Sequence, residues 1–216
     1  MKKIVIATTN KNKIERIKNL LRNEDYEILS LFDVIDNSIK EPSEIFETGL
    51  DNSIIKSTYY VDYVPEGVIV LSQDDTIELI GISKEDDPQG HIKEPVVKKY
   101  GEFTDLNAVN YYKDLANKYG GSILMNFRYG HSVAIKKSGN KTYKKVLGKT
   151  SVLKSRLVNE IYKLDKRPGY FLASLMEVEI NGKWVKYNDL DDSELVLLDA
   201  DLYDSIITML NEIKDE

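Results

Sequence analysis

"IVIATTNKNK", residues 4–13, predicts a buried strand followed directly by a helix. The apolar, β-branched run within residues 3–7 is typical of a buried strand. From Ile14 to Leu21, apolar residues recur at helical spacing. Lys11 and Lys13 therefore stand where backbone N–H groups already make the helix end positive. We expect a negatively charged group to bind against them.

The loop between this strand and this helix has groups suited to holding a phosphate. Asn10 and Asn12 compete for the helix N-cap, because Asn12 is followed by Glu15 in the spacing of a capping box. The Thr8 hydroxyl, the Asn10 amide and free backbone N–H groups would contact phosphate oxygens, with Lys13 as a point charge. The glycines of a P-loop are absent. The alternative is an ordinary solvated helix start, which costs little when the charges are exposed.

Composition limits the classes of partner and metal. The 216 residues are enough for one domain with a substantial core, and 42% hydrophobic content is ordinary for a globular protein. A formal net charge of −6 argues against a broad nucleic-acid-binding surface. The chain has no cysteine and only two histidines, so disulfides and thiolate metal sites are excluded and a histidine-built zinc site is disfavoured. Any bound metal is expected to have oxygen ligands.

The sequence also gives an expectation about location. No apolar stretch approaches the ~20 residues that span a bilayer. The apolar run that ends at Ala7 gives way at once to polar residues, unlike the core of a signal peptide. We therefore expect a cytoplasmic protein with no membrane partner.

Apolar patterning along the rest of the chain predicts a mixed α/β sheet with helices packed on it. The expected strands are 68–72, 122–137 and a hairpin over 176–187, and the expected helices are 50–63, 104–118 and 201–213. The hairpin rests on Asn181-Gly182, a type I′ turn pair, between alternating strands. Residues 151–165 fit either a strand or a helix.

The helix over 50–63 is expected to present an apolar face to the core. The residues of that face are Leu50, Ile54, Ile55, Thr58 and Val61. Lys56 lies on the same helix, and a helical lysine is most often at the surface. The segment before the helix contains Glu41, Glu44 and Glu47, and its simplest interpretation is an exposed acidic loop.

Two adjacent carboxylates, Asp74 and Asp75, directly follow the expected strand 68–72. The carboxyl ends of sheet strands are where open α/β sheets bind ligands. Like charges so close repel unless a cation neutralises them, which points to Mg²⁺. The alternative is that one carboxylate caps a turn and the other is solvated.

Together, three segments resemble the noncanonical purine NTP pyrophosphatase family, the inosine/xanthosine triphosphatases. The segments are "ATTNKNK", "EIFETGLDNSIIK" and "LSQDDTIEL". The later segments "EPVVKKYGEFTDLNAVNYYKDL" and "NFRYGHSVAIK" extend the resemblance, which is collinear over about residues 1–137. The matching residues are Thr8, Asn10, Lys13, Glu44, Lys56, Asp74, Asp75 and Thr76. The carboxyl-terminal third departs from the family, because "RPGYFLASL" keeps only Gly169-Tyr170 of its base-binding segment and residues 177–216 contain neither histidine nor arginine.

The resemblance implies an enzyme that hydrolyses a nucleoside triphosphate, expected to be a noncanonical purine nucleotide, to the monophosphate and pyrophosphate. It implies Mg²⁺ held by Glu44, Asp74 and Asp75, with Asp75 orienting or deprotonating the attacking water. Lys13 has a catalytic and phosphate-binding role in this scheme. The other implied substrate-binding residues are Thr8, Asn10, Lys56, Thr76 and Tyr170.

The resemblance also implies an architecture: an elongated mixed β-sheet with flanking helices and two lobes around a central cleft, in a homodimer. The lobes are expected over residues 1–80 plus 195–216 and over 81–194. Three alternatives remain: a catalytically inactive nucleotide-binding or regulatory module of the same fold, a Maf-type pyrophosphatase, and a structural protein without a small-molecule site. The Maf interpretation is weakened because "ATTNKNK" lacks the arginines of the Maf loop.

Overall fold

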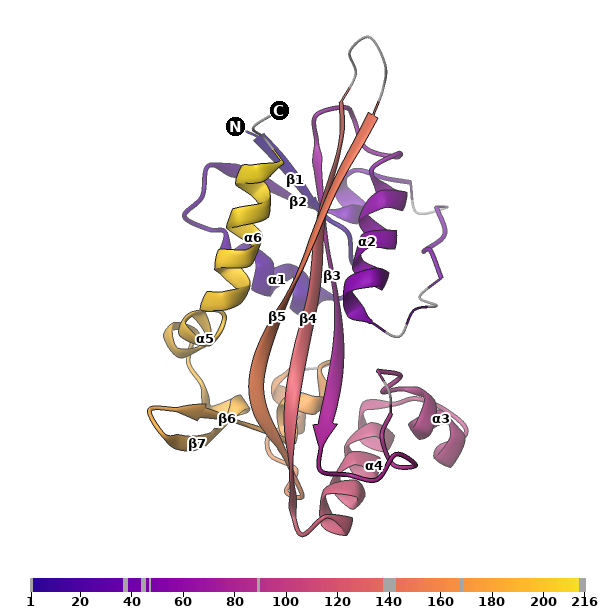
Figure 1. Ribbon diagram of the computed structural model, residues 1–216, viewed down its shortest axis with the longest axis vertical. Coiled ribbons are helices and arrows are strands. Elements are labelled where there is room, and N and C mark those ends of the chain that lie inside the picture. Colours follow the sequence, from indigo (N-terminus) through magenta and orange to yellow (C-terminus); the bar gives the residue numbers. More distant parts are fainter. Residues whose placement is uncertain are drawn as a thin grey trace. The chain divides into compact units, whose positions relative to one another are not determined.

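The fold is a mixed sheet with helices on both faces of its amino-terminal part (Figure 1). The computed structural model describes residues 2–36, 39–43, 46, 48–88, 90–137, 143–167 and 169–213. Its strands are β1 Lys2–Ile6, β2 Tyr26–Ser30, β3 Ile69–Ile80, β4 Ser122–Lys137, β5 Tyr143–Val158, β6 Met176–Ile180 and β7 Lys183–Lys186. Its helices are α1 Lys11–Leu20, α2 Gly49–Tyr60, α3 Glu94–Tyr100, α4 Asp105–Lys118, α5 Asp192–Leu198 and α6 Ala200–Glu212.

The strands are hydrogen-bonded in the order β2-β1-β3-β4-β5-β6-β7. β1 pairs in parallel with both β2 and β3, whereas β6 pairs antiparallel with β5 and β7. The sheet is therefore mixed, and the predicted α/β class with flanking helices is confirmed.

The chain forms two compact units. The first unit contains Met1–Asp75, Tyr129–Ser151 and Asp199–Glu216, and the second contains Thr76–Arg128 and Val152–Leu198. Residues of β3, β4 and β5 belong to both units, because each of these strands continues from one unit into the other. The segment Tyr129–Ser151 lies in the first unit, although the sequence placed it in the second lobe. The expected lobes, 1–80 plus 195–216 and 81–194, kept residues 122–158 in one lobe and so did not allow for strands shared between two units.

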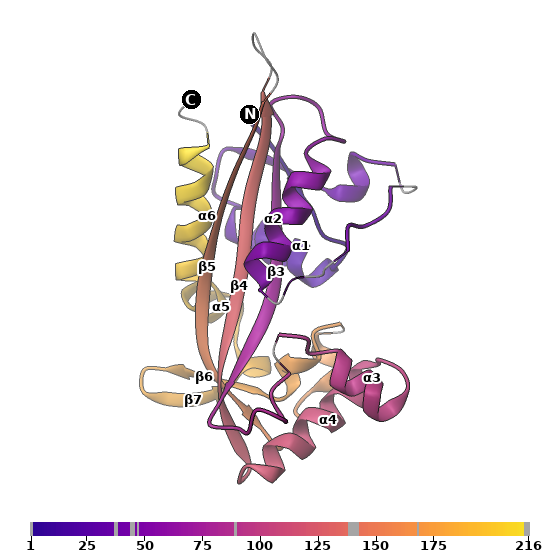
Figure 2. The same ribbon diagram turned by 45° about the vertical axis from the view of Figure 1, so that its right-hand side comes forward.

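In the first unit, helices cover both faces of the sheet. Figures 1 and 2 show α2 on one side of β3–β5 and α6 on the other. Val5 of β1 and Ala7, just after this strand, pack in one apolar cluster with Tyr60 of α2, and Val70 of β3 and Ala134 of β4 belong to the same cluster. Alternate residues on these strands must therefore face α6.

The first helix, α1, lies on the α6 face. The Arg16 guanidinium of α1 makes a bidentate ion pair with Asp199, the N-cap of α6, and the bond from Nε to Oδ2 measures 2.6 Å. The same guanidinium stands 4.1 Å from the centre of the Tyr129 ring on β4. Charge-assisted bidentate pairs of this kind fix orientation as well as distance, so α1 is held both to the last helix and to the sheet.

The α2 helix packs most closely on the sheet through small residues. Of the predicted apolar face only Val61 is buried, and Leu50, Ile54, Ile55 and Thr58 are half-buried. The buried residues of α2 include Ser53 and Ser57. Ser53 Oγ donates to the Ser72 carbonyl oxygen at 3.1 Å and lies 2.8 Å from Ser132 Oγ. Short side chains that hydrogen-bond across this interface let the helix approach the strands closely.

Several other expectations are settled by the structure. The strand within residues 3–7, the helix over 104–118, the long strand 122–137 and the closing helix are confirmed as β1, α4, β4 and α6. The type I′ hairpin is also confirmed, with positive φ at both Asn181 and Gly182. The ambiguous segment 151–165 continues β5 as far as Val158. Asp74 and Asp75 lie inside the 12-residue strand β3, so the expectation that they follow a strand is wrong.

Among the described residues, no helix has both the length and the apolar character needed to cross a bilayer.

The α2 backbone passes close to Gly130 of β4, and this contact provides a test of how α2 packs on the sheet. A Cβ atom at Gly130 of β4 would lie 2.1 Å from the Leu50 nitrogen and 2.2 Å from the Gly49 carbonyl carbon. Because backbone atoms cannot move aside singly, we expect Gly130→Ala to lower the free energy of unfolding by about 3 kcal/mol. Urea denaturation followed by circular dichroism measures this change.

Gly148→Ala is the matched control. Its Cβ would meet only the side-chain ends of Leu50 and Ile54, at 2.9 Å and more. These ends rotate away, so we expect a loss of about 1 kcal/mol or less. Equal losses in the two variants would contradict the close packing of α2 on β4.

Candidate functional site

The loop after β1 places the first residues of α1 beside β3. Asn10 is the N-cap, and its Oδ1 accepts hydrogen bonds from the backbone N–H groups of Asn12 at 2.9 Å and Lys13 at 3.3 Å. The Asn10 backbone N–H donates to Thr8 Oγ1 at 3.2 Å, and Thr8 is itself buried. Of the two candidate caps, the chain therefore uses Asn10. This cap fixes the orientation of the turn that carries Lys13.

Lys13 reaches the two adjacent carboxylates of β3. Its Nζ lies 3.1 Å from Asp75 Oδ2 and 3.8 Å from Asp74 Oδ1, and it donates to the Gln73 carbonyl oxygen at 3.4 Å. All three charged side chains are less than one-fifth exposed. The ammonium group therefore neutralises the carboxylates in a partly desolvated place, where such pairing is stronger than at a surface.

Lys56 reaches Asp74 from α2. Its side chain is only 5% exposed, and its Nζ lies 3.9 Å from Asp74 Oδ1 and 3.7 Å from Glu41 Oε1. The interpretation of Lys56 as a surface lysine is therefore wrong. The close packing of α2 through its serines explains this burial, because it brings the whole inward face of the helix near the strand.

The two lysines approach β3 from opposite faces. Asp74 and Asp75 are consecutive in a strand, so their side chains point to opposite faces of the sheet. Lys13 comes from α1 on the α6 face, and Lys56 comes from α2 on the other face. β1 pairs with β3 as far as Ile6 and Leu71, after which β3 continues toward the carboxylates. The cluster thus lies beyond the carboxyl end of a parallel strand, where open α/β sheets bind ligands.

The structure brings together six of the residues that the sequence singled out. Thr8, Asn10, Lys13, Lys56, Asp74 and Asp75 all lie in the first unit, in the contacts described above. Thr76 and Tyr170 belong to the second unit. There the Tyr170 ring packs edge-on against the rings of Phe127 and Tyr187, at 5.9 and 5.7 Å between centroids. Glu44 lies outside the described residues, so its predicted role is not tested.

The carboxylates offer only part of a metal site. Within the described residues, no three histidine, aspartate or glutamate side chains gather in a way that would hold a metal ion. Asp74 and Asp75 nevertheless supply two carboxylates with oxygen donors only. Mg²⁺ is commonly bound by one or two carboxylates together with water and substrate phosphates. The donor set therefore fits Mg²⁺ with a bound polyphosphate.

Two residues of the site escaped the sequence analysis. Gln73 is 1% exposed, and its Nε2 donates to Asp75 Oδ1 at 2.8 Å. His131 of β4 is fully buried, with its Nδ1 at 3.0 Å from the Tyr129 carbonyl oxygen. Burial lowers the pKa of His131 to about 4, against the raising effects of that hydrogen bond and of the Asp75 charge. The sequence did contain a signal for Gln73. Residues two apart in a strand share one face, so Gln73 could have been expected to lie beside Asp75.

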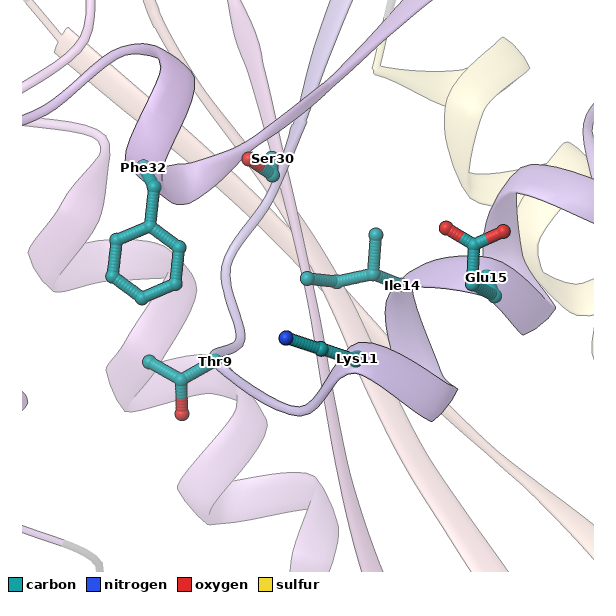
Figure 3. Close-up of a pocket in the computed structure, with 6 residues that line it drawn as sticks. All are labelled: Thr9, Lys11, Ile14, Glu15, Ser30 and Phe32. Carbon is teal, nitrogen blue, oxygen red and sulfur yellow. The ribbon is translucent and has the colours of Figure 1, made fainter. Parts of the chain in front are cut away.

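Lys11 does not join Lys13. It lines a separate hollow of about 320 Å³ together with Thr9, Ile14, Glu15, Ser30 and Phe32. Figure 3 shows the ammonium group of Lys11 pointing into this hollow from the start of α1. The two lysines of "NKNK" therefore have different surroundings, and only Lys13 takes part in the carboxylate cluster.

Residues 4–85 match the sequence model of the Ham1 family. This segment carries all six residues that meet in the first unit. The match confirms, over this segment, the family resemblance that the spacing of the motifs indicated. No curated protein sequence matches the chain significantly.

Solved structures extend the likeness of fold to nearly the whole chain. A HAM1 protein from Coxiella burnetii has a TM-score of 0.64 at 16% identity, covering 98% of this chain and 100% of that one. A nucleoside-triphosphatase, dITP/XTP pyrophosphatase, from Mycobacterium abscessus has a TM-score of 0.58 at 16% identity, covering 98% and 97%. The Ham1 protein of Staphylococcus aureus has a TM-score of 0.58 at 18% identity, covering 99% and 98%. The chain therefore has the fold of Ham1 proteins.

The buried His131 makes stability depend on pH. Its pKa is about 4 in the folded protein and near 6.5 in the unfolded chain, so the unfolded chain binds more protons between these values. The contribution of His131 to the free energy of unfolding is therefore fully present above pH 6.5 and decreases as the pH drops toward 4. We expect the free energy of unfolding to be about 2 kcal/mol lower at pH 5 than at pH 7 from this residue alone.

Urea denaturation of the wild type and of His131→Gln at pH 7 and pH 5 measures this contribution. The variant should lose less stability on acidification than the wild type. The same loss in both proteins would show that His131 is not the group that titrates.

Proposed function

We propose that this protein is a metal-dependent nucleoside-triphosphate pyrophosphatase. It would hydrolyse a nucleoside triphosphate, of the noncanonical purine class, to the monophosphate and pyrophosphate. One observation carries the proposal: Lys13 and Lys56, from two helices, converge on Asp74 and Asp75 beyond the carboxyl end of β1. The dITP/XTP pyrophosphatase activity in the name of the Mycobacterium abscessus neighbour supports the substrate class.

The charges of the lysine–carboxylate cluster favour binding of a polyphosphate together with a metal cation. Counting only these five described side chains, Glu41, Asp74 and Asp75 carry three negative charges and Lys13 and Lys56 carry two positive charges, which leaves one negative charge. A phosphate chain alone would be repelled by this surplus. Mg²⁺ bound by Asp74 and Asp75 would neutralise both the carboxylates and the phosphate oxygens.

The lysines would then exchange partners. The Lys13 and Lys56 ammonium groups, now paired with carboxylates, would turn to the phosphate oxygens on which negative charge grows during hydrolysis. The Thr8 hydroxyl and the first backbone N–H groups of α1 would hold the end of the phosphate chain, since the N-terminus of a helix favours anions. Asn10 contributes by fixing that turn through its cap.

Asp75 is placed to act on the attacking water. Gln73 holds one of its carboxylate oxygens, and Lys13 contacts the other. When Lys13 turns to phosphate, Asp75 Oδ2 would be able to orient a water molecule or take its proton. The carboxylate would keep its direction meanwhile, because Gln73 still donates to Oδ1.

Further parts of the proposal concern residues outside this cluster. Glu44 would add a carboxylate to the metal site, and Thr76 and Tyr170 would contact the nucleotide. We also propose a cytoplasmic homodimer. The two-lobed architecture with a central cleft, which the family resemblance implied, belongs to the same proposal.

A pyrophosphate-release assay tests the function. Purified protein with Mg²⁺ should release pyrophosphate from at least one nucleotide in a panel of ITP, XTP, dITP and the four common NTPs, and chelation of the metal should stop the reaction. Thermal stabilisation by a nucleotide without turnover would instead favour the inactive nucleotide-binding module. Absence of both effects would contradict the proposal.

Asp75→Asn tests the role of the carboxylate. Removing a positioned base typically costs about 10²–10⁴ in rate, so kcat should fall by that factor while the circular dichroism spectrum stays the same. Asp25→Asn, at an exposed aspartate of the same unit, is the control and should keep full activity. Pyrophosphate release by Asp75→Asn at the wild-type rate would remove Asp75 from this role.

A further inference from the structure

Two buried polar atoms near Asp75 lack a hydrogen-bond partner. They are Oε1 of Gln73 and Nε2 of His131, each fully enclosed and unbonded in the part of the chain that the structure describes. Gln73 is 1% exposed and His131 is fully buried. Buried polar atoms are nearly always satisfied, because an unsatisfied one costs about 1–3 kcal/mol. Two such atoms close together therefore require an explanation.

Contacts that reach both strands indicate how β3 and β4, neighbours in the sheet, are aligned. Ser53 of α2 bonds to both the Ser72 carbonyl of β3 and the Ser132 hydroxyl of β4. Ahead of β3, the Gly67 N–H donates to the Lys136 carbonyl oxygen at 3.0 Å. As the residue number rises along β3 it falls along β4, which defines an antiparallel pair.

Ser72 of β3 and Ser132 of β4 therefore lie opposite each other. Gln73 follows Ser72 on β3 and His131 precedes Ser132 on β4, so Gln73 and His131 are the next opposed pair. Directly opposed residues of an antiparallel pair have Cβ atoms about 4.5–5.5 Å apart and share one face. Asn126 and Glu78 obey the same register farther along, with Nδ2 donating to Oε2 at 2.9 Å. The two unbonded atoms thus belong to neighbouring side chains.

Both unbonded atoms are hydrogen-bond acceptors. His131 Nδ1 lies 3.0 Å from the Tyr129 carbonyl oxygen, so the proton must be on Nδ1 and Nε2 keeps its lone pair. The Gln73 amide donates through Nε2 to Asp75, so Oε1 points away from the carboxylate. Two acceptors cannot bond to each other. They require a third group that supplies two protons.

We propose that Gln73 and His131 together bind one buried water molecule, and that His131 acts through it as a positioning residue for Asp75. The water donates one hydrogen to His131 Nε2 and the other to Gln73 Oε1. Buried waters of this kind typically make about three hydrogen bonds to groups that are otherwise unsatisfied. The catalytic consequence rests on the proposed function, whereas the water site itself does not.

The water gives the Gln73 amide one orientation. A flipped amide would turn its oxygen toward the negative Asp75 carboxylate and its NH₂ toward the water. The donated hydrogen bond at Oε1 therefore holds the NH₂ group on Asp75 Oδ1. This bond in turn keeps Oδ2 directed toward Lys13 and the place where the phosphates would bind.

Structural measurements test the water site without any assay of activity. The chain has only two histidines, so His91→Gln leaves His131 as the sole histidine in a ¹⁵N-labelled sample. At pH 7 we expect ¹⁵N NMR to show the Nδ1-protonated tautomer of His131. A crystal structure at high resolution should show a water within hydrogen-bond distance of both acceptors. The Nε2-protonated tautomer, or a direct bond between Gln73 and His131, would overturn the proposal.

Two polar variants test the positioning role. His131→Gln places an amide oxygen about where Nε2 lies and is expected to keep the water and near-wild-type kcat. His131→Asn keeps a donor near Nδ1 but is too short to reach the water. For His131→Asn we expect kcat to fall about 10–100-fold with KM unchanged. This is the loss typical of residues that orient a metal ligand through a hydrogen bond.

Other outcomes of the variant pair overturn the positioning role. An equal fall of kcat in both variants would mean that His131 only fills space, and no fall in either would mean that the water does not act on Asp75. A rise in KM alone would also contradict it. If the wild type releases no pyrophosphate from any nucleotide, the proposed function fails, and the tautomer and crystal measurements still decide the water site.

Discussion

The structure of the first unit depends on the neutralisation of two consecutive carboxylates from both faces of one strand. Neighbouring side chains in a strand point in opposite directions, and lysines from both helical layers contact these two. Lys13 of α1 lies within 3.8 Å of both carboxylates, and Lys56 of α2 adds a second contact to Asp74. The N-cap at Asn10 and the close approach of α2 at Gly130 have the same effect, because each fixes where one ammonium group can go.

Burial of the charged groups in this cluster costs free energy. An ammonium group in a nearly dry place costs several kcal/mol unless it is paired, and Lys56 is the least exposed lysine, arginine, aspartate or glutamate among the described residues, at 4%. The ion pairs with Asp74 at 3.9 Å and Glu41 at 3.7 Å offset part of that cost.

The sequence was sufficient to predict β1, α1 and the spacing that unites Thr8, Lys13, Lys56 and Asp75, because a strand, a helix start and adjacent carboxylates are local patterns. For α2 it predicted the helix but not its buried face, since helical periodicity is counted in apolar residues and this helix also buries serines and a lysine. His131 has no local signal at all: its meaning comes from a register with Gln73 on another strand. The second unit retains too little of the family pattern for Tyr170 to be judged from the sequence.

The ion pair between Arg16 and Asp199 joins residues 183 positions apart. During synthesis on a ribosome, this contact can form only after the chain has been made as far as Asp199. A nascent chain that stops before α6 therefore lacks it, although the Asn10 cap and the contacts of Lys13 with β3 involve only earlier residues. The attachment of α1 to the last helix is thus a late event compared with its attachment to β3.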